Sequence, residues 1–82
     1  MSKVHELKVL EQFMLAIIDG TKTFEVRLND RDYQIGDWLL LKEWDGRTYS
    51  GIERMRSVIY VLQGGQFGIQ DGYCVLGIRN PY

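Results

Sequence analysis

The spacing of hydrophobic residues changes along the chain, from a helical period near the N-terminus to a period of two. Five apolar residues recur at intervals of three and four and form one stripe of a predicted helix: Leu10, Phe13, Met14, Ile17 and Ile18. Asp19 and Gly20 end this helix, because glycine readily takes the left-handed conformation that follows a last helical turn. A short strand over residues 4–9 comes before it, and we expect the stripe to pack on a sheet.

After the helix, residues 23–28 alternate between apolar and polar side chains, as strands do. The apolar side chains are Phe24, Val26 and Leu28, and the polar ones are Thr23, Glu25 and Arg27. This alternation predicts a half-buried strand with one polar face.

Further strands are predicted over residues 38–44, 47–53, 55–62 and 73–79, with polar or glycine-rich turns between them. One helix after the first strand, followed by many short strands, favours an α+β, mainly β fold. Such a fold is a small β-barrel or a strongly curved sheet with a helix on its open side.

The composition is that of an ordinary globular chain. With 82 residues there is room for one domain, covering residues 1–82. No apolar run approaches the ~18 residues that a membrane-spanning helix needs. The single cysteine, Cys74, lies in an apolar strand and is expected to be buried and inert. We therefore expect a cytoplasmic protein without a cofactor.

The charge balance restricts the kind of partner. Ten basic and 11 acidic residues give a formal net charge of −1. Proteins that grip long nucleic acids usually carry a large basic excess, because each neutralised phosphate needs a nearby cation. A short ligand bound at a local basic cluster is more consistent with this balance.

One such cluster follows the helix, where Lys22, Glu25 and Arg27 occur within six residues. Glu25 and Arg27 share a strand face at roughly 6.5–7 Å along the strand. Arginine can fork onto a phosphate or a base edge, a carboxylate can accept from an amine, and lysine adds a point charge. The spacing alone favours a solvated ion pair beside a turn lysine, since such pairs are common on surfaces.

The residues around this cluster resemble a known signature. Residues 20–27, Gly-Thr-Lys-Thr-Phe-Glu-Val-Arg, are similar to the GxKxxExR signature of the ASCH superfamily in the same helix-to-strand context. Residues 5–8, 29–31, 36–37, 43–44, 64–68 and 73–78 resemble one small bacterial and phage family within it. The resemblance implies a PUA-like β-barrel whose cleft takes RNA or a nucleotide, lined by Lys22, Glu25 and Arg27.

Some ASCH proteins are small amidohydrolases acting on acylated cytidine through a lysine, a threonine and a distant glutamate. Lys22 matches that lysine, but Glu25 stands in place of the threonine. Residues 55–62 offer no clear counterpart of the glutamate. The resemblance therefore favours a protein that is not an enzyme, with Lys22 and Glu25 as the catalytic pair if it is one.

Two further residues are candidate ligand contacts. Arg31 follows the predicted strand, where a turn supplies no structural reason for a guanidinium. His5 is the single histidine and could carry protons or donate a hydrogen bond, although a lone histidine is more often structural. No spacing of histidine, cysteine or carboxylate residues suggests a metal site.

Other features have a structural interpretation. Trp38 is expected in the core, and Arg47, Arg54 and Arg56 are expected on a solvated strand face. The glycine-rich residues 63–68 form a strand connection or a flap over the cleft, with Phe67 at its tip.

Three functions remain open at this point. The first is a module that binds RNA or a nucleotide through Lys22, Glu25, Arg27, Arg31 and His5. The second is an amidohydrolase acting on a modified nucleoside. The third is a protein-interaction module of a kind that a phage could encode. The sequence does not indicate the oligomeric state.

Overall fold

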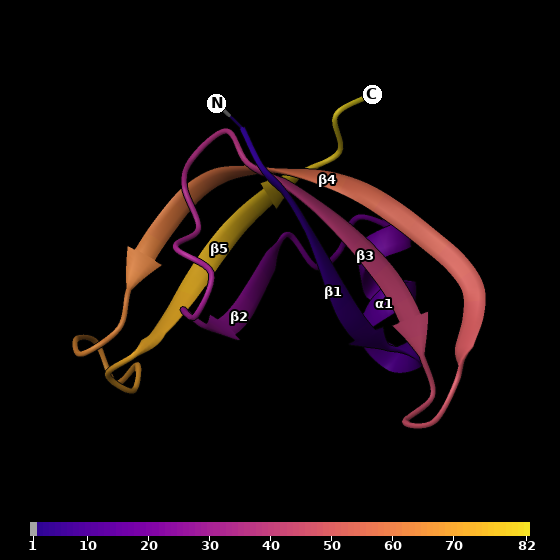
Figure 1. The fold of residues 1–82 in the computed structure, drawn as a ribbon, viewed down its shortest axis with the longest axis horizontal. Coiled ribbons are helices and arrows are strands. Elements are labelled where there is room, and N and C mark those ends of the chain that lie inside the picture. The colour runs from indigo at the N-terminus through magenta and orange to yellow at the C-terminus, as the bar shows by residue number, and fades with distance from the viewer. Residues whose placement is uncertain (1) are drawn as a thin grey trace.

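Residues 2–82 are described in a computed structural model, in which one short helix and five strands make up the regular structure (Figure 1). In chain order these elements are β1 (Val4–Leu10), α1 (Glu11–Ile18), β2 (Phe24–Leu28), β3 (Trp38–Trp44), β4 (Tyr49–Gln63) and β5 (Tyr73–Arg79). Within these residues, no helix has the length and apolar character needed to cross a membrane.

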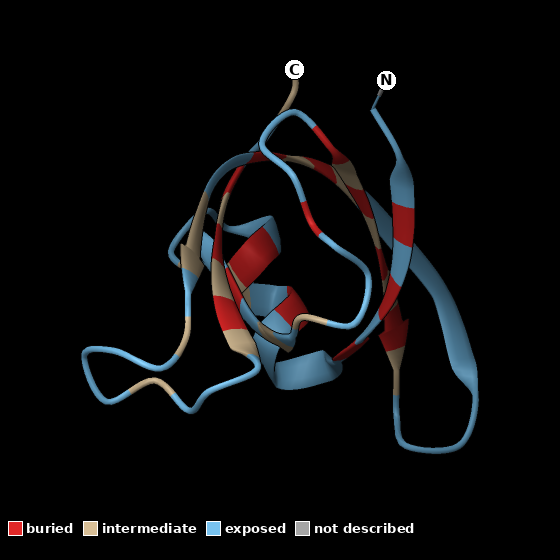
Figure 2. Ribbon diagram, turned by 60° about the vertical axis from the view of Figure 1, so that its left-hand side comes forward, coloured by how far each residue is buried: buried red, intermediate tan, exposed pale blue. Residues whose placement is uncertain are grey.

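All five strands belong to one sheet with the order β1-β3-β4-β5-β2. β1 runs parallel to β3, and the other neighbours are antiparallel. The sheet curls into a half-barrel around α1 (Figure 2). This confirms the expected α+β, mainly β fold, in the form of a strongly curved sheet with a helix on its open side. Because β1 and β2 are the two ends of the strand order, both are edge strands.

The segment predicted as two strands, over residues 47–53 and 55–62, is a single 15-residue strand, β4. Its first part pairs with β3 and its second part with β5, and Ser57 pairs with both neighbours. Register shifts at residues 42–44 and 58–60 let the long strand bend. The prediction of two strands was wrong because the bend is made by bulges, without the glycine or proline turn that would separate two strands.

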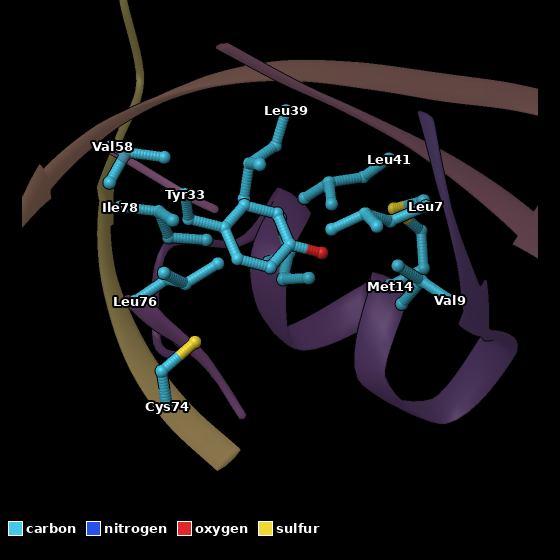
Figure 3. Close-up of a cluster of buried hydrophobic side chains, with 11 residues drawn as sticks. Leu7, Val9, Met14, Tyr33, Leu39, Leu41, Val58, Cys74, Leu76 and Ile78 are labelled. Atoms are coloured by element: carbon cyan, nitrogen blue, oxygen red, sulfur yellow. The ribbon is translucent and has the colours of Figure 1, made fainter. Parts of the chain in front are cut away.

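The core fills the concave side of the sheet and contains alternate residues of three strands (Figure 3). Its buried members are Leu7, Val9, Met14, Ile17, Tyr33, Leu39, Leu41, Val58, Cys74, Leu76 and Ile78. Cys74 is buried, as predicted, and desolvation raises the pKa of its thiol. Each fully buried aliphatic side chain contributes about 1.5–3 kcal/mol relative to an exposed one.

Trp38 does not belong to this core. It is half-buried and alternates with Leu39 along β3, so it lies on the convex face, and the prediction of a core position was wrong. Trp44, at the other end of β3, is approached by a cation: Lys8 Nζ lies 4.8 Å from its ring centroid.

Arg56 is buried on the concave side, which contradicts its predicted place on a solvated face. Its guanidinium donates to the carbonyls of Ile17 (3.2 Å) and Met55 (2.8 Å). Ile17 lies in the last turn of α1, which contains no basic residue of its own. Arg56 therefore supplies the cation that favours a helix C-terminus. Burial lowers its pKa, and the neighbouring charge of Arg54 acts in the same direction.

Candidate functional site

Strand β2 turns its charged side chains inward. Glu25 pairs with Leu76 and Arg27 pairs with Cys74, and cross-strand partners share one face of a sheet. Both core partners are fully buried, so Glu25 and Arg27 lie on the concave face.

The apolar side chains of β2 lie on the convex face instead. Phe24, Val26 and Leu28 are each about half exposed. The predicted alternation is correct, but the expectation that the apolar side is the buried one was wrong. The inward face of this edge strand is closed by charged groups that bind one another.

These charged groups form one cluster with Lys22, which we call the Lys-Glu-Arg cluster. Lys22 Nζ donates to Glu25 Oε1 at 2.5 Å. Arg27 donates to Glu25 Oε2 through Nε (3.0 Å) and Nη2 (2.8 Å). The Glu25 side chain is only 5% exposed, whereas the side chains of Lys22 and Arg27 are 17% and 24% exposed. The carboxylate is thus the buried centre, and the two cations border the solvent.

Arg27 and Arg31 connect the two edges of the sheet, whereas Lys22 donates hydrogen bonds to groups of β2. Arg27 Nη2 donates to the Lys8 carbonyl of β1 at 2.8 Å, and Lys22 Nζ donates to the Phe24 carbonyl of β2 at 2.6 Å. Arg31 Nη1 donates to the Glu6 carbonyl of β1 at 2.7 Å. We call the gap between β1 and β2 the seam. Side chains bridge it, because no backbone ladder joins these two strands in residues 2–82.

A pocket of about 450 Å³ opens in the seam. Its lining comes from β1, from α1, and from β2 together with Lys22, which precedes β2. The lining residues are Lys8, Val9, Leu10, Phe13, Lys22, Phe24, Glu25, Val26 and Arg27. The walls are mainly apolar and the Lys-Glu-Arg cluster supplies most of the charge. This size and lining are typical of small-molecule sites.

Two aromatic rings flank the lysine of the cluster. Lys22 Nζ lies 4.9 Å from the ring centroid of Phe24 and 5.7 Å from that of Phe13. Both residues are nearly half exposed, at 46% and 43%, so part of each side chain is open to solvent. The pocket combines a cationic end with aromatic walls.

His5 lies elsewhere on β1 and is not part of the pocket lining. It is buried, its Nε2 is 2.8 Å from Asp37 Oδ2, and its ring packs edge-on against Tyr33 with centroids 4.8 Å apart. Burial acts to raise the pKa of Asp37, but hydrogen bonds from His5 and from the amides of Lys3 and Gln34 outweigh it and lower the pKa. The structure therefore separates His5 from the Lys-Glu-Arg cluster.

Arg31 lies beside the seam but outside the pocket lining. Its side chain is 43% exposed, and its second contact is a 4.0 Å approach to Asp30. Phe67, at the tip of the loop between β4 and β5, is 82% exposed and does not line the pocket either. Of the five predicted site residues, the structure brings three together and leaves Arg31 nearby and His5 apart.

The pocket walls were not identified from the sequence. The signal for Phe13 was present, because the apolar stripe of α1 contains more residues than this eight-residue helix buries: Met14 and Ile17 are buried, whereas Phe13 and Ile18 are partly exposed. The apolar side of β2 is likewise a signal for a second apolar wall, but the alternation alone predicts that this side is buried.

Within residues 2–82, no group of three or more histidine, cysteine or acidic side chains lies close enough to hold a metal ion. At the pocket itself, the carboxylate of Glu25 is already bound by two cationic side chains. The chemistry available there is the binding of anions and of apolar rings.

Comparison with known proteins identifies a family and a phage relative to which the chain is similar. The family described as "Domain of unknown function (DUF3850)" matches residues 4–78. A protein of Escherichia phage P2, named "Uncharacterized 12.9 kDa protein in GpA 3'region", is 37% identical over 51 residues. This match covers 62% of the present chain and 47% of the phage protein, so it spans about half of that relative's length.

Proposed function

The chain belongs to the family described as "Domain of unknown function (DUF3850)", and we propose that it binds RNA or a nucleotide in the seam pocket. One observation carries the proposal: two cationic side chains, held by a buried carboxylate, border an apolar pocket with two aromatic rings. A nucleotide has the matching parts, because it joins an anionic phosphate to a flat ring.

Each residue of the cluster has a distinct part in this proposal. Lys22 and Arg27 contact phosphate, the lysine as a point charge and the arginine as a planar fork. Phe13 and Phe24 contact the base, and stacking on an aromatic ring contributes about 1–3 kcal/mol per base. Glu25 accepts three hydrogen bonds and so mainly positions the two cations, with one of its roughly four acceptor sites left for a base or sugar donor.

The proposal concerns a short ligand. The chain has a formal net charge of −1, and Lys42, a partly buried cation outside the pocket lining, is already near Glu6 and Glu53. A long nucleic acid, which needs many cations along its backbone, fits this charge balance less well than a short ligand does. Binding is therefore expected to be weak and to fall as salt rises, because counterions compete for the few phosphate contacts.

The resemblance of residues 20–27 to the ASCH signature supports the same proposal. On this interpretation the half-barrel is a PUA-like domain, and the seam pocket is the cleft in which ASCH proteins take their ligand. The cytoplasm is the compartment that fits, since RNA is abundant there and a free buried thiol such as Cys74 stays reduced.

The proposal is tested by titrating a panel of nucleotides and short RNAs into the parent protein and into Lys22→Ala and Arg27→Ala variants. We expect each variant to lose at least about tenfold in affinity, because each removes a charge-assisted contact. Lys42→Ala and Arg54→Ala are matched controls, since both cations lie outside the pocket lining. If the pocket variants bind the panel as the parent does, the assignment is wrong.

The other two functions have no specific observation in their favour. For hydrolysis, Lys22 Nζ is engaged by Glu25 and by the Phe24 carbonyl, an arrangement suited to a bound ammonium. Turnover of acylated cytidines by the parent and not by Lys22→Ala would support an amidohydrolase. A protein partner would be indicated by material that the domain captures from a lysate and that RNase treatment does not release.

A further inference from the structure

The seam offers hydrogen-bond donors and few free acceptors. Among its carbonyls, that of Lys8 accepts from Arg27 and that of Phe24 accepts from Lys22. Both oxygens of Glu25 are bound as well. The acceptors that a ligand donor could use are therefore largely occupied by the protein's own cations.

The free donors on β1 follow from the alternation of its backbone. Successive residues of a strand direct their N–H and C=O groups to opposite sides. The Lys3 carbonyl accepts from Trp38 at the start of β3, so odd-numbered residues of β1 face β3. Even-numbered residues face the seam, as the carbonyls of Glu6 and Lys8 confirm by binding the two arginines. The amides of Lys8 and Leu10 therefore point into the seam.

The same reasoning applies to β2. The Thr23 carbonyl accepts from Ile78, and the Asn29 amide donates to Gly72, so odd-numbered residues face β5. The amides of Phe24 and Val26 consequently point away from β5, toward the seam. Within residues 2–82 no strand pairs with either of these edges. All four residues with seam-facing amides line the pocket: Lys8, Leu10, Phe24 and Val26.

Charge restricts the ligand further. At the pocket, the two cations Lys22 and Arg27 accompany one carboxylate, Glu25, so the net charge of this cluster is positive. The third cationic residue of the lining, Lys8, holds its ammonium 4.8 Å from the Trp44 ring. A phosphomonoester carries about 1.5–2 negative charges at pH 7, whereas a phosphodiester inside a chain carries one. A phosphomonoester is also an acceptor group with three terminal oxygens, which suits a site rich in N–H donors.

We propose that the seam pocket recognises a phosphomonoester: the terminal phosphate of a mononucleotide or of a short RNA, with its base against Phe13 or Phe24. This inference rests on the proposed function and narrows it from any RNA or nucleotide to one with a phosphorylated end. The phosphate is held jointly by the Lys22 and Arg27 side chains and by the edge amides of both strands.

Isothermal titration of the parent protein with matched ligands tests the chemistry of the end group. The panel consists of one RNA tetramer with a 5′-phosphate, a 3′-phosphate or hydroxyl ends, together with a mononucleotide, its nucleoside and inorganic phosphate. We expect either the 5′-phosphorylated or the 3′-phosphorylated tetramer to bind at least about tenfold more tightly than the tetramer with hydroxyl ends. The mononucleotide should exceed its nucleoside by the same factor. Inorganic phosphate should bind more weakly than the mononucleotide, because it lacks the ring.

Amide chemical shifts test the place of binding. Titration of the ¹⁵N-labelled protein with the mononucleotide should shift the amides of Lys8, Leu10, Phe24 and Val26. The amides of Val9 and Glu25, which face sheet neighbours, are internal controls and should move less. Shifts confined to these control amides, or to residues outside the pocket, would overturn the inference.

The two proposals fail in distinguishable ways. If hydroxyl-ended RNA binds as tightly as phosphorylated RNA, the preference for a phosphomonoester is wrong and the binding function stands. If no member of the panel binds at millimolar concentration, both proposals are wrong. Inorganic phosphate binding as tightly as the mononucleotide would also overturn the inference, because the aromatic walls would then have no part in recognition.

Discussion

Two buried carboxylates, Glu25 and Asp37, lie in contrasting environments in this half-barrel. Both residues are less than 5% exposed, but their partners differ in distance along the chain. Glu25 is bound by its near neighbours Lys22 and Arg27, whereas Asp37 is bound by Lys3 and His5, which are 34 and 32 positions away. Glu25 accepts its hydrogen bonds from two long charged side chains at an open pocket. Asp37 accepts from His5 and from two backbone amides, beside the buried ring of Tyr33.

The difference lies in what each carboxylate fixes in space. Asp37 holds the start of β1 and the turn before β3, and none of the residues that donate to it lines the pocket. Glu25 holds two cations whose other faces border the pocket, so the charges that it orients are accessible. A buried carboxylate is therefore a structural tie in one case and the support of a candidate site in the other.

The largest effect is expected on stability from Asp37→Ala. This change leaves the His5 ring and the amides of Lys3 and Gln34 without their acceptor in a buried place. We expect the free energy of unfolding to fall by about 3 kcal/mol, since each buried unpaired donor costs roughly 1–3 kcal/mol and relaxation recovers a part. Urea denaturation at pH 7 measures the loss.

The same variant also tests whether the two carboxylates act independently, when its ligand affinity is measured. At a temperature where Asp37→Ala is still folded, its affinity for the ligands of the seam pocket should equal that of the parent, because Asp37 lies outside the lining. A folded Asp37→Ala protein that has lost binding would show that the two carboxylates are not independent.

A smaller effect, mainly on ligand affinity and not on stability, is expected from Arg27→Lys. Lysine keeps the charge but loses the planar fork that joins Glu25 to the Lys8 carbonyl. We expect the affinity for a nucleotide to fall about tenfold, or ~1.4 kcal/mol, with a loss of stability below about 1 kcal/mol. Arg54→Lys is the control, because its guanidinium is exposed and donates only to the adjacent Glu53 carbonyl. An equal loss in both variants would contradict a specific part for Arg27.

The sequence was sufficient to predict the helix, most strands and the convergence of Lys22, Glu25 and Arg27. These depend on short-range features: period, turn residues, and two side chains that are two apart on a strand. What it did not predict depends on contacts between distant residues. Arg27 binds the carbonyl of a residue 19 positions away, and Arg56 binds a carbonyl 39 positions away.

The inverted faces of β2 show why such contacts escape local reasoning. Phe24, Val26 and Leu28 alone predict a buried apolar face, because burial of apolar area is the dominant favourable term. Here the concave face next to β5 receives Glu25 and Arg27, whose hydrogen bonds to Lys22 and to the opposite sheet edge satisfy them there. That alternative depends on the curl of the sheet, which brings β1 to the far side of the seam.

The smallest expected effect is a change in the free energy of unfolding at acid pH. The pKa of Asp37 in the folded protein is lowered, so its carboxylate contributes stability that is fully present above the unfolded-state pKa, near 3.8. This contribution is lost as the pH falls through the lower folded value. The difference in unfolding free energy between the parent and Asp37→Ala should therefore shrink below about pH 4.

Urea denaturation of both proteins at matched pH values measures this difference. Asp19 and Asp45, which are exposed and also have lowered pKa values, are common to the two proteins and cancel. His5 faces the carboxylate directly, so a His5→Gln variant separates the contribution of the imidazole ring from that of the two amide hydrogen bonds that remain. A difference between parent and Asp37→Ala that stays constant down to pH 3 would show that the ionised carboxylate is not what holds this region. The contrast between Asp37 as a structural tie and Glu25 as the base of a site would then lose its electrostatic basis.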